Sequence, residues 1–231
     1  MHTFVLVHGA WDGGWFWSPI ADRLRARGHR AYAVTLTGLG ERSHLVEAPI
    51  DLALHIQDVV HVLEFEELTA VHLVGHGYGG FVATGVADRV PQRLQQLIYV
   101  DGFVPQDGQS FLDLLPPEER AIVADRMAND TTSLPYPGVP YDSRLRPHPL
   151  DTLTQRIVLK NPDRQRVPTA FVHCTGKGEP VPPLYGAVEA SAQLARERGW
   201  PYRTLPTGHN PNFTMPDRTT EVLLELADLA G

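Results

Sequence analysis

The turn with the clearest chemical signature runs from Gly75 to Gly79 and reads Gly-His-Gly-Tyr-Gly. An apolar stretch precedes it and a helical pattern follows it, which is the setting of the G-x-S-x-G turn that exposes a reactive serine. Here the central position carries a glycine, Gly77. Small flanking residues suit such a turn because its central residue takes a positive φ and the backbone packs closely. The sequence therefore predicts a turn built for nucleophilic chemistry that lacks the nucleophile's side chain.

Two backbone amides beside this turn are predicted to bind a negatively charged oxygen. The segment His8-Gly-Ala-Trp11 follows the first apolar stretch, so the amide of Ala10 would supply one donor and the amide of Tyr78 the other. Main-chain donors do not depend on a serine side chain, and this oxyanion hole would survive its absence. We also expect Trp11 and His76, from the same two turns, to contact the substrate.

A histidine and a carboxylate would complete the groups needed for proton transfer. His209 follows the last predicted strand, where a general base is expected. Two carboxylates could orient it: Asp101 at the end of the strand predicted over 94–100, and Glu179 after the following strand, which is the more usual position. We favour Asp101 because a residue directly at a strand end is held without slack, but Glu179 stays open as the alternative.

The elements that must position these groups alternate along the chain. Apolar stretches predict strands at 4–7, 31–36, 71–74, 94–100, 169–174 and 202–205, and helical patterns predict helices at 16–27, 52–65, 81–90, 183–198 and 216–229. This alternation is typical of the α/β class, with a mostly parallel central sheet flanked by helices. We therefore predict a single domain over residues 1–231.

The region from about 104 to 167 breaks the alternation, because prolines recur there and interrupt any long helix. We predict that it is a small lid inserted into the domain. Aromatic side chains at its start and within it, Phe103 and Tyr136, are expected to contact the substrate. Apolar and aromatic walls of this kind suit a small or medium apolar carbonyl or ester compound.

Composition limits the partners and the compartment. The chain has 20 Lys and Arg against 27 Asp and Glu, a net charge of −7, with no basic run that would attract nucleic acid. No apolar stretch reaches the roughly 20 residues of a membrane-spanning helix. The single cysteine, Cys174, cannot form an intrachain disulfide, and the first residues enter an apolar stretch directly, so we expect a cytoplasmic protein.

The predicted partner is a small-molecule substrate, and a homodimer is left open. No group of residues has the spacing of metal ligands, and the loop at His8 to Trp11 lacks the glycines that cradle a phosphate. We therefore expect neither a metal nor a cofactor.

Five segments together resemble bacterial esterase-like α/β hydrolases related to plant methylesterases, hydroxynitrile lyases and methylketone synthases. They are residues 7–11, 37–42, 75–80, 99–105 and 208–209. The resemblance covers almost the whole chain and implies the α/β-hydrolase fold, with the base at His209 and the oxyanion donors at Ala10 and Tyr78. Family members normally have serine at the position of Gly77, and plant members have an aspartate near Gly178. This chain departs from the pattern at both places.

The missing serine leaves three hypotheses for the function. In the first, which we favour, His209 moves a proton while the two amides hold an enolate or carbonyl oxygen, giving decarboxylation, elimination or cyclisation. The resembling methylketone synthases indicate that the scaffold can work without the serine. In the second, a serine carboxylesterase was inactivated by an engineered Ser-to-Gly change at position 77. In the third, the chain is a non-catalytic pseudoenzyme that binds a ligand.

Overall fold

Six parallel strands form the central sheet of the protein. The computed structural model describes residues 1–46, 49–129, 132–137, 139–178 and 183–230. The strand order is β2-β1-β3-β4-β7-β8, and every neighbouring pair is parallel. The bounds are β1 Thr3–Val7, β2 Arg30–Val34, β3 Val71–His76, β4 Leu94–Val100, β7 Thr169–Cys174 and β8 Tyr202–Leu205. The predicted α/β class with a mostly parallel sheet is thereby confirmed.

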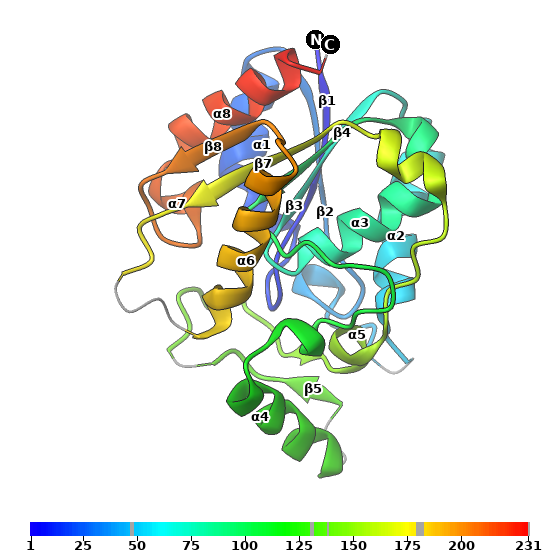
Figure 1. Ribbon diagram of the computed structural model, residues 1–231, viewed down its shortest axis with the longest axis vertical. Helices are drawn as coiled ribbons and strands as arrows, with labels where there is room; N and C mark the ends of the chain where they lie inside the picture. Colours follow the sequence, from blue (N-terminus) through cyan, green and yellow to red (C-terminus); the bar gives the residue numbers. More distant parts are fainter. Residues whose placement is uncertain (47–48, 130–131, 138, 179–182, 231) are drawn as a thin grey trace.

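Helices cover both faces of this sheet (Figure 1). On one face, α1 (Ser18–Ala26) and α8 (Pro216–Asp228) share a core cluster with the strands. On the other face, α2 (Leu52–Phe65), α3 (Gly79–Arg89) and α6 (Pro183–Glu197) contribute to a second cluster. Because both faces are covered, the inner strand β1 reads as a nearly continuous apolar stretch, whereas the edge strands β2 and β8 are partly exposed and include polar residues.

The carboxyl ends of the six strands lie at one edge of the sheet because all strands run in the same direction. In open parallel sheets this edge is where ligands bind. Figure 1 shows α4, β5 and α5 beyond this edge, at the lower end of the molecule, and both chain termini at the opposite end. The predicted chemical groups follow β1, β3, β4 and β8, so they converge on the edge that these elements cover.

The segment between β4 and β7 contains more structure than the sequence predicted. It holds η4 (Leu112–Leu114), α4 (Pro117–Ala128), α5 (Asp151–Thr154), η5 (Pro162–Arg166) and the antiparallel pair β5 (Ser133–Leu134) and β6 (His148–Pro149). The helix α4 begins at Pro117. A proline at the first position of a helix loses no hydrogen bond and already has a helical φ. The same proline that interrupts one helical pattern therefore starts the next helix.

Other predicted bounds agree closely with the structure. The helix α2 and the strands β4, β7 and β8 have the predicted first and last residues. The first predicted helix instead begins as η1 (Gly14–Trp17) before α1, and the short elements η2 (Gly40–Arg42), η3 (Pro91–Arg93) and α7 (Pro211–Thr214) were not predicted. Within the described ranges, no helix is long and apolar enough to cross a membrane.

Candidate active site

The turn after β3 has the backbone conformation predicted for it. Gly77 has a φ of +51°, and the amide of Phe103 donates to its carbonyl oxygen at 3.1 Å. A Cβ on Gly75 would lie 2.5 Å from the carbonyl oxygen of Gly79, and a Cβ on Gly79 would lie 2.6 Å from the carbonyl oxygen of Val7. The two flanking positions therefore require glycine because the backbone packs against them.

His209 lies on the side of Gly77 from which a side chain would project. A Cβ built on Gly77 would be 3.2 Å from Nε2 of His209, and Nδ1 of the same ring lies 2.6 Å from Oδ2 of Asp101. Since a carboxylate accepts, the hydrogen bond places the proton of a neutral ring on Nδ1 and leaves Nε2 as the acceptor toward position 77. The arrangement is that of a nucleophile, base and acid with the nucleophile's side chain removed.

Asp101 is buried and surrounded by donors. Its Oδ1 accepts from the amide of Cys174 at 3.0 Å and lies 2.9 Å from Nζ of Lys177. A φ of +45° directly after β4 turns the chain, a conformation that aspartate tolerates better than most residues. Burial alone would raise the pKa of Asp101, but the hydrogen bond and charge of His209 and the charge of Lys177 outweigh it and lower the pKa below its usual value. Asp101 is therefore ionised at neutral pH.

Lys177 is a member of this cluster that the sequence did not predict. Its side chain is 2% exposed and lies within 3.0 Å of the carboxylates of both Asp101 and Glu189. A signal was present in the chain, since Lys177 belongs to the segment after β7 in which Glu179 was considered. Glu179 itself lies outside the described residues.

His76 packs beneath the ring of His209, with 4.4 Å between the two centroids. Its Nε2 donates to the carbonyl oxygen of His209 at 2.7 Å, while its buried Nδ1 has no partner among the described residues. Burial and the neighbouring His209 lower the pKa of His76 to about 3, so the ring is neutral. His76 thus supports the loop that carries His209, and its contact with substrate stays a prediction.

The loop after β1 lies against the turn at Gly77. The Cα of Gly9 is 3.7 Å from the position that a Cβ on Gly77 would occupy. In the described part of the chain, the amides of Ala10 and Tyr78 donate to no backbone or side-chain acceptor. The hydroxyl of Tyr78 bonds instead to Nδ1 of His55 at 3.0 Å. The two amides therefore have no acceptor among the described residues that would compete with a ligand, and their role as oxyanion donors stays a prediction.

A second buried carboxylate, Asp12, lies close to Gly9 and was not predicted. A Cβ on Gly9 would lie 3.3 Å from Oδ2 of Asp12 and 3.0 Å from Nδ1 of His76. Asp12 is 3% exposed and accepts a hydrogen bond from the hydroxyl of Tyr141. Burial raises the pKa of Asp12 to about 7, although the bond from Tyr141 acts in the opposite direction. This edge of the sheet therefore holds a carboxyl group that is partly protonated at neutral pH.

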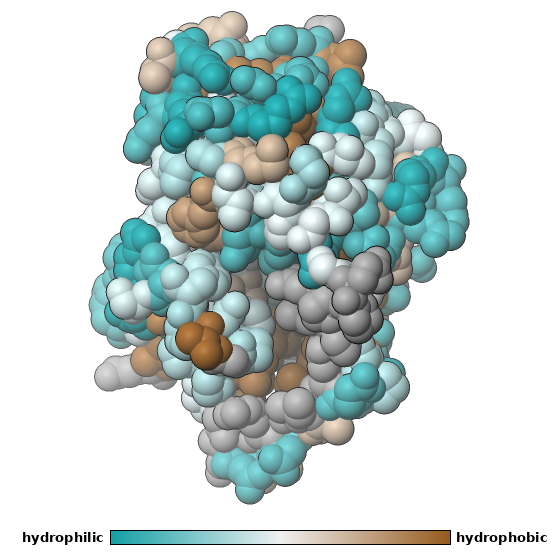
Figure 2. Space-filling model, turned by 90° about the vertical axis from the view of Figure 1, so that its left-hand side faces the viewer, coloured by the Kyte–Doolittle hydropathy of each residue, from teal (hydrophilic) through white to brown (hydrophobic). Residues whose placement is uncertain are grey.

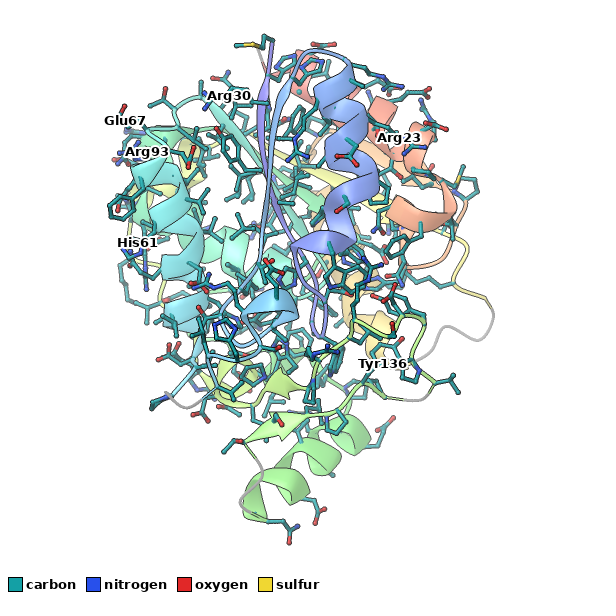
Figure 3. All side chains as sticks on the ribbon, turned by 180° about the vertical axis from the view of Figure 1, so that it is seen from behind. Arg23, Arg30, His61, Glu67, Arg93 and Tyr136 are labelled. Carbon is teal, nitrogen blue, oxygen red and sulfur yellow. The ribbon has the colours of Figure 1, made fainter. Side chains whose placement is uncertain are left out.

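Aromatic side chains of the β1 loop and the inserted segment pack together at this edge. The indole of Trp11 donates to the carbonyl oxygen of Leu134 at 2.8 Å and lies 5.5 Å from the ring of Tyr136, which lies 5.6 Å from that of Tyr141. Figure 3 shows Tyr136 at the same end of the molecule as α4, and Figure 2 shows apolar surface in a hollow just above that end. The side chain of Phe103, in contrast, is 3% exposed and packs on Phe111, so its predicted contact with substrate stays untested.

The other buried histidines next to the site are held by hydrogen bonds. His8 bonds to the carbonyl oxygen of Gly9 and accepts from the amide of Leu36, and His148 accepts from the amide of Trp11. Burial lowers the pKa of His8 to about 3, so its ring is neutral. Across the ranges that the structure describes, no group of three or more His, Cys, Asp or Glu residues could hold a metal ion.

Comparison with known proteins decides the family. A family model described as the alpha/beta hydrolase family matches residues 4–222. The chain belongs to the alpha/beta hydrolase family. It is an alpha/beta hydrolase enzyme related to esterases and lyases.

Two relatives of this alpha/beta hydrolase show the range of similar enzymes. The carbendazim hydrolyzing esterase of Nocardioides sp. (strain SG-4G) is 52% identical over 116 residues, which are 50% of this chain and 48% of that protein. The alpha-hydroxynitrile lyase of Arabidopsis thaliana is 31% identical over 105 residues, 45% of this chain and 41% of that protein. In both cases the chain spans about half or less of the relative's length.

A solved structure supports the same fold over nearly the whole chain. An extracellular alpha/beta-hydrolase from a Paenibacillus species superposes with a TM-score of 0.78, covering 98% of this chain and 99% of that one. The two sequences are 23% identical. At this identity, the similarity establishes a shared fold and leaves the reaction to be argued from the site.

Proposed function

We propose that this alpha/beta hydrolase transfers protons at a small or medium apolar or aromatic carbonyl or ester compound without forming a covalent enzyme intermediate. One observation carries the proposal. Nε2 of His209 lies 3.2 Å from the place where a Cβ would stand on Gly77, so the basic nitrogen faces a turn that has no nucleophile. Asp101 orients the ring from the other side through the bond of 2.6 Å to Nδ1.

In the proposed reaction, Nε2 of His209 accepts a proton from the carbon next to the substrate carbonyl. The electron pair of the broken C–H bond moves into the carbonyl group, and the enolate oxygen accepts hydrogen bonds from the amides of Ala10 and Tyr78. In an elimination, the pair then expels a leaving group from the adjacent carbon, and the leaving group takes the proton from His209. In a decarboxylation, Nε2 of His209 first takes the carboxyl proton of the substrate, loss of carbon dioxide gives the enolate, and protonated His209 returns that proton to the carbon.

The surroundings of the site support an apolar or aromatic substrate. Trp11, Tyr136 and Tyr141 form a series of ring contacts, and the hydroxyl of Tyr141 bonds to Asp12. Aromatic rings and a polar group therefore lie together at this edge of the sheet. An esterase and a lyase among the relatives also support a scaffold that serves more than one reaction class.

Deuterium exchange into aryl methyl ketones tests the proton transfer directly. In D₂O, the methyl proton signal of acetophenone should disappear faster with the protein than with its His209→Ala variant. General base catalysis contributes about 10²–10⁴-fold, which sets the expected loss. His61→Ala is the matched control, because His61 is exposed on α2 (Figure 3) and away from the site. Equal exchange rates for the protein and His209→Ala would contradict the proposal.

A serine esterase whose nucleophile has been replaced is the second candidate, and the geometry at position 77 favours it. The three atoms nearest to a Cβ there are two ring atoms of His209 and the Cα of Gly9, at 3.2 Å or more. A small shift of the imidazole would therefore admit a side chain, and Gly77→Ser should hydrolyse p-nitrophenyl acetate about 10³-fold faster than the chain with glycine.

The control for this test is another glycine with a positive φ. Gly28 has a φ of +82° and open space around its Cβ position, so Gly28→Ser adds the same hydroxyl far from His209. If Gly77→Ser gains no more esterase activity than Gly28→Ser, the esterase candidate fails. Ketone exchange by the unaltered chain is expected only for the first candidate, so the two tests separate them.

A further inference from the structure

Three charged side chains form a row behind His209: Asp101, Lys177 and Glu189. Nζ of Lys177 lies 2.9 Å from Oδ1 of Asp101 and 3.0 Å from Oε1 of Glu189. It also donates to the carbonyl oxygen of Cys174 at 2.6 Å. The ammonium group thus donates hydrogen bonds to Glu189 and to the backbone and forms an ion pair with Asp101.

The row is built from separate elements and ends at the surface. Asp101 follows β4, Lys177 follows β7, and Glu189 comes from α6. Glu189 is held from a second side, because Nε2 of His173 lies 2.9 Å from the same Oε1. The exposed fraction of the side chains rises along the row, from 0% for Asp101 through 2% for Lys177 to 38% for Glu189. The charge of Glu189 is therefore screened by solvent, whereas that of Lys177 is not.

Hydrogen bonding alone does not require a lysine at this place. Asp101 already accepts from His209 and from the amide of Cys174. Removing an ammonium group from water is energetically costly, and an apolar side chain of similar size is often as stable in such a position. What the ammonium adds is a positive charge in contact with the carboxylate that orients His209.

We propose that Lys177 and Glu189 are positioning residues that set the proton affinity of the Asp101–His209 pair, which Lys177 lowers and Glu189 restores. This inference rests on the proposed role of His209 as general acid and base. With all three members charged, the row carries one net negative charge. Without the charge of Glu189 it carries none, and without that of Lys177 it carries two, so the two losses act on an imidazolium in opposite directions.

Among the residues that the structure describes, further titratable groups also lie around this pair. The ring of His76 lies 4.4 Å from that of His209, and burial keeps it neutral by lowering its pKa to about 3. Burial also raises the pKa of the Cys174 thiol, so this group stays uncharged. His173 faces Glu189 on the far side of the row. Lys177 and Glu189 are therefore charged neighbours of this pair whose loss should change its proton affinity.

The test is an NMR titration of the His209 ring in the whole protein, with its signal assigned by its loss in His209→Gln. In Glu189→Gln, the titration midpoint of His209 should fall by about half a unit to one unit, and in Lys177→Met it should rise by about one unit. Lys177→Arg keeps the charge, so its His209 midpoint should lie close to that of the parent protein.

The controls change charges away from this row. They are Glu225→Gln, whose side chain is 40% exposed and paired with Arg218, and Lys160→Met, which removes an exposed lysine. Neither should move the midpoint.

The directions in which the His209 midpoint moves in the two variants decide the outcome. Midpoints that stay in place, or that move the same way in Glu189→Gln and Lys177→Met, overturn the inference, because loosening of the site would not produce opposite shifts. If Lys177→Met does not fold, Glu189→Gln and Lys177→Arg decide it alone: a fall in the first and no change in the second support it, and any other pattern overturns it. The titration uses no substrate. If the midpoints shift as expected but His209→Ala exchanges ketone protons as fast as the parent, the proposed function fails and the electrostatic role stands.

Discussion

Two buried carboxyl groups at the same edge of the sheet differ in their affinity for a proton: one has a lowered pKa and the other a raised one. Asp101 follows β4 and is 0% exposed, and Asp12 follows β1 and is 3% exposed. Burial acts to raise the pKa of both groups. The pKa of Asp101 is nevertheless lowered, whereas that of Asp12 is raised to about 7.

Their partners explain the difference. Asp101 receives hydrogen bonds from His209 and the amide of Cys174 and contacts the ammonium of Lys177. For Asp12, the described residues supply one donor, the neutral hydroxyl of Tyr141. Depth of burial is nearly equal, so the number and charge of the donors decide which acid is ionised. Pairs of groups whose pKa values are pushed apart in this way are typical of acid–base sites.

Replacing Asp101, the carboxylate with more partners, should have the largest effect on the stability of the protein. Asp101→Asn leaves the buried ammonium of Lys177 with one carboxylate fewer, and breaking a buried ion pair costs about 3–5 kcal/mol in the free energy of unfolding. Urea unfolding at pH 7 measures it. Asp107→Asn is the control, because Asp107 pairs with Lys160 at the surface and exposed pairs contribute about 0–1 kcal/mol. If Asp101→Asn and Asp107→Asn lose similar amounts of unfolding free energy, the contacts of Asp101 do not stabilise the protein more than a surface ion pair does.

The sequence predicted the fold well because buried parallel strands leave a strong pattern. The stretches at β4, β7 and β8 had the observed bounds, and the buried halves of β4 and β7 are mostly apolar, as expected of strands covered on both faces. The helix α4 escaped prediction because Pro117 starts it, and a proline within a proline-rich region indicates a loop as readily as a helix start.

The site was predictable where a residue directly follows a strand. Gly77 and Asp101 do so, His209 lies in the short loop after β8, and the carboxyl ends of parallel strands lie at the same edge. Asp12 and Lys177 lie in glycine-rich segments that indicate exposed turns. Their burial comes from contacts distant in the chain, since Tyr141 is 129 residues from Asp12. The position of Lys177 in the loop after β7 was a signal for this segment, but no local pattern shows that Lys177 or Asp12 is buried.

The raised pKa of Asp12 predicts a pH-dependent change in stability. Below about pH 4 this carboxyl group is protonated in both the folded and the unfolded chain and contributes nothing. Between about pH 4 and 7 the unfolded chain loses the proton while the folded chain keeps it, so rising pH favours unfolding, by up to about 4 kcal/mol above pH 7. Asp12→Asn cannot ionise, so its stability relative to the parent should increase from pH 4 to pH 8.

Unfolding curves at a series of pH values measure this difference. Taking parent and variant together cancels the buried histidines, which affect stability in the acid range in both chains. Asp22→Asn serves as control, because Asp22 lies on the exposed surface of α1 beside Arg25. If the stability of Asp12→Asn relative to the parent is the same at pH 4 and pH 8, then Asp12 is not held protonated by its surroundings.

Tyr141→Phe should give the smallest and most specific effect. It removes the donor that lowers the pKa of Asp12, so the carboxyl carbon signal of Asp12 should titrate about half a unit to one unit higher, with a stability loss of about 0.5–1.5 kcal/mol at pH 8. Tyr136→Phe is matched to it, because this neighbouring ring lies 5.6 Å from Tyr141 and makes no hydrogen bond to Asp12. If Tyr141→Phe leaves the titration of Asp12 in place, one donor does not govern this carboxylate. The difference in pKa between Asp12 and Asp101 would then arise from the charge of the groups around Asp101 rather than from the number of donors.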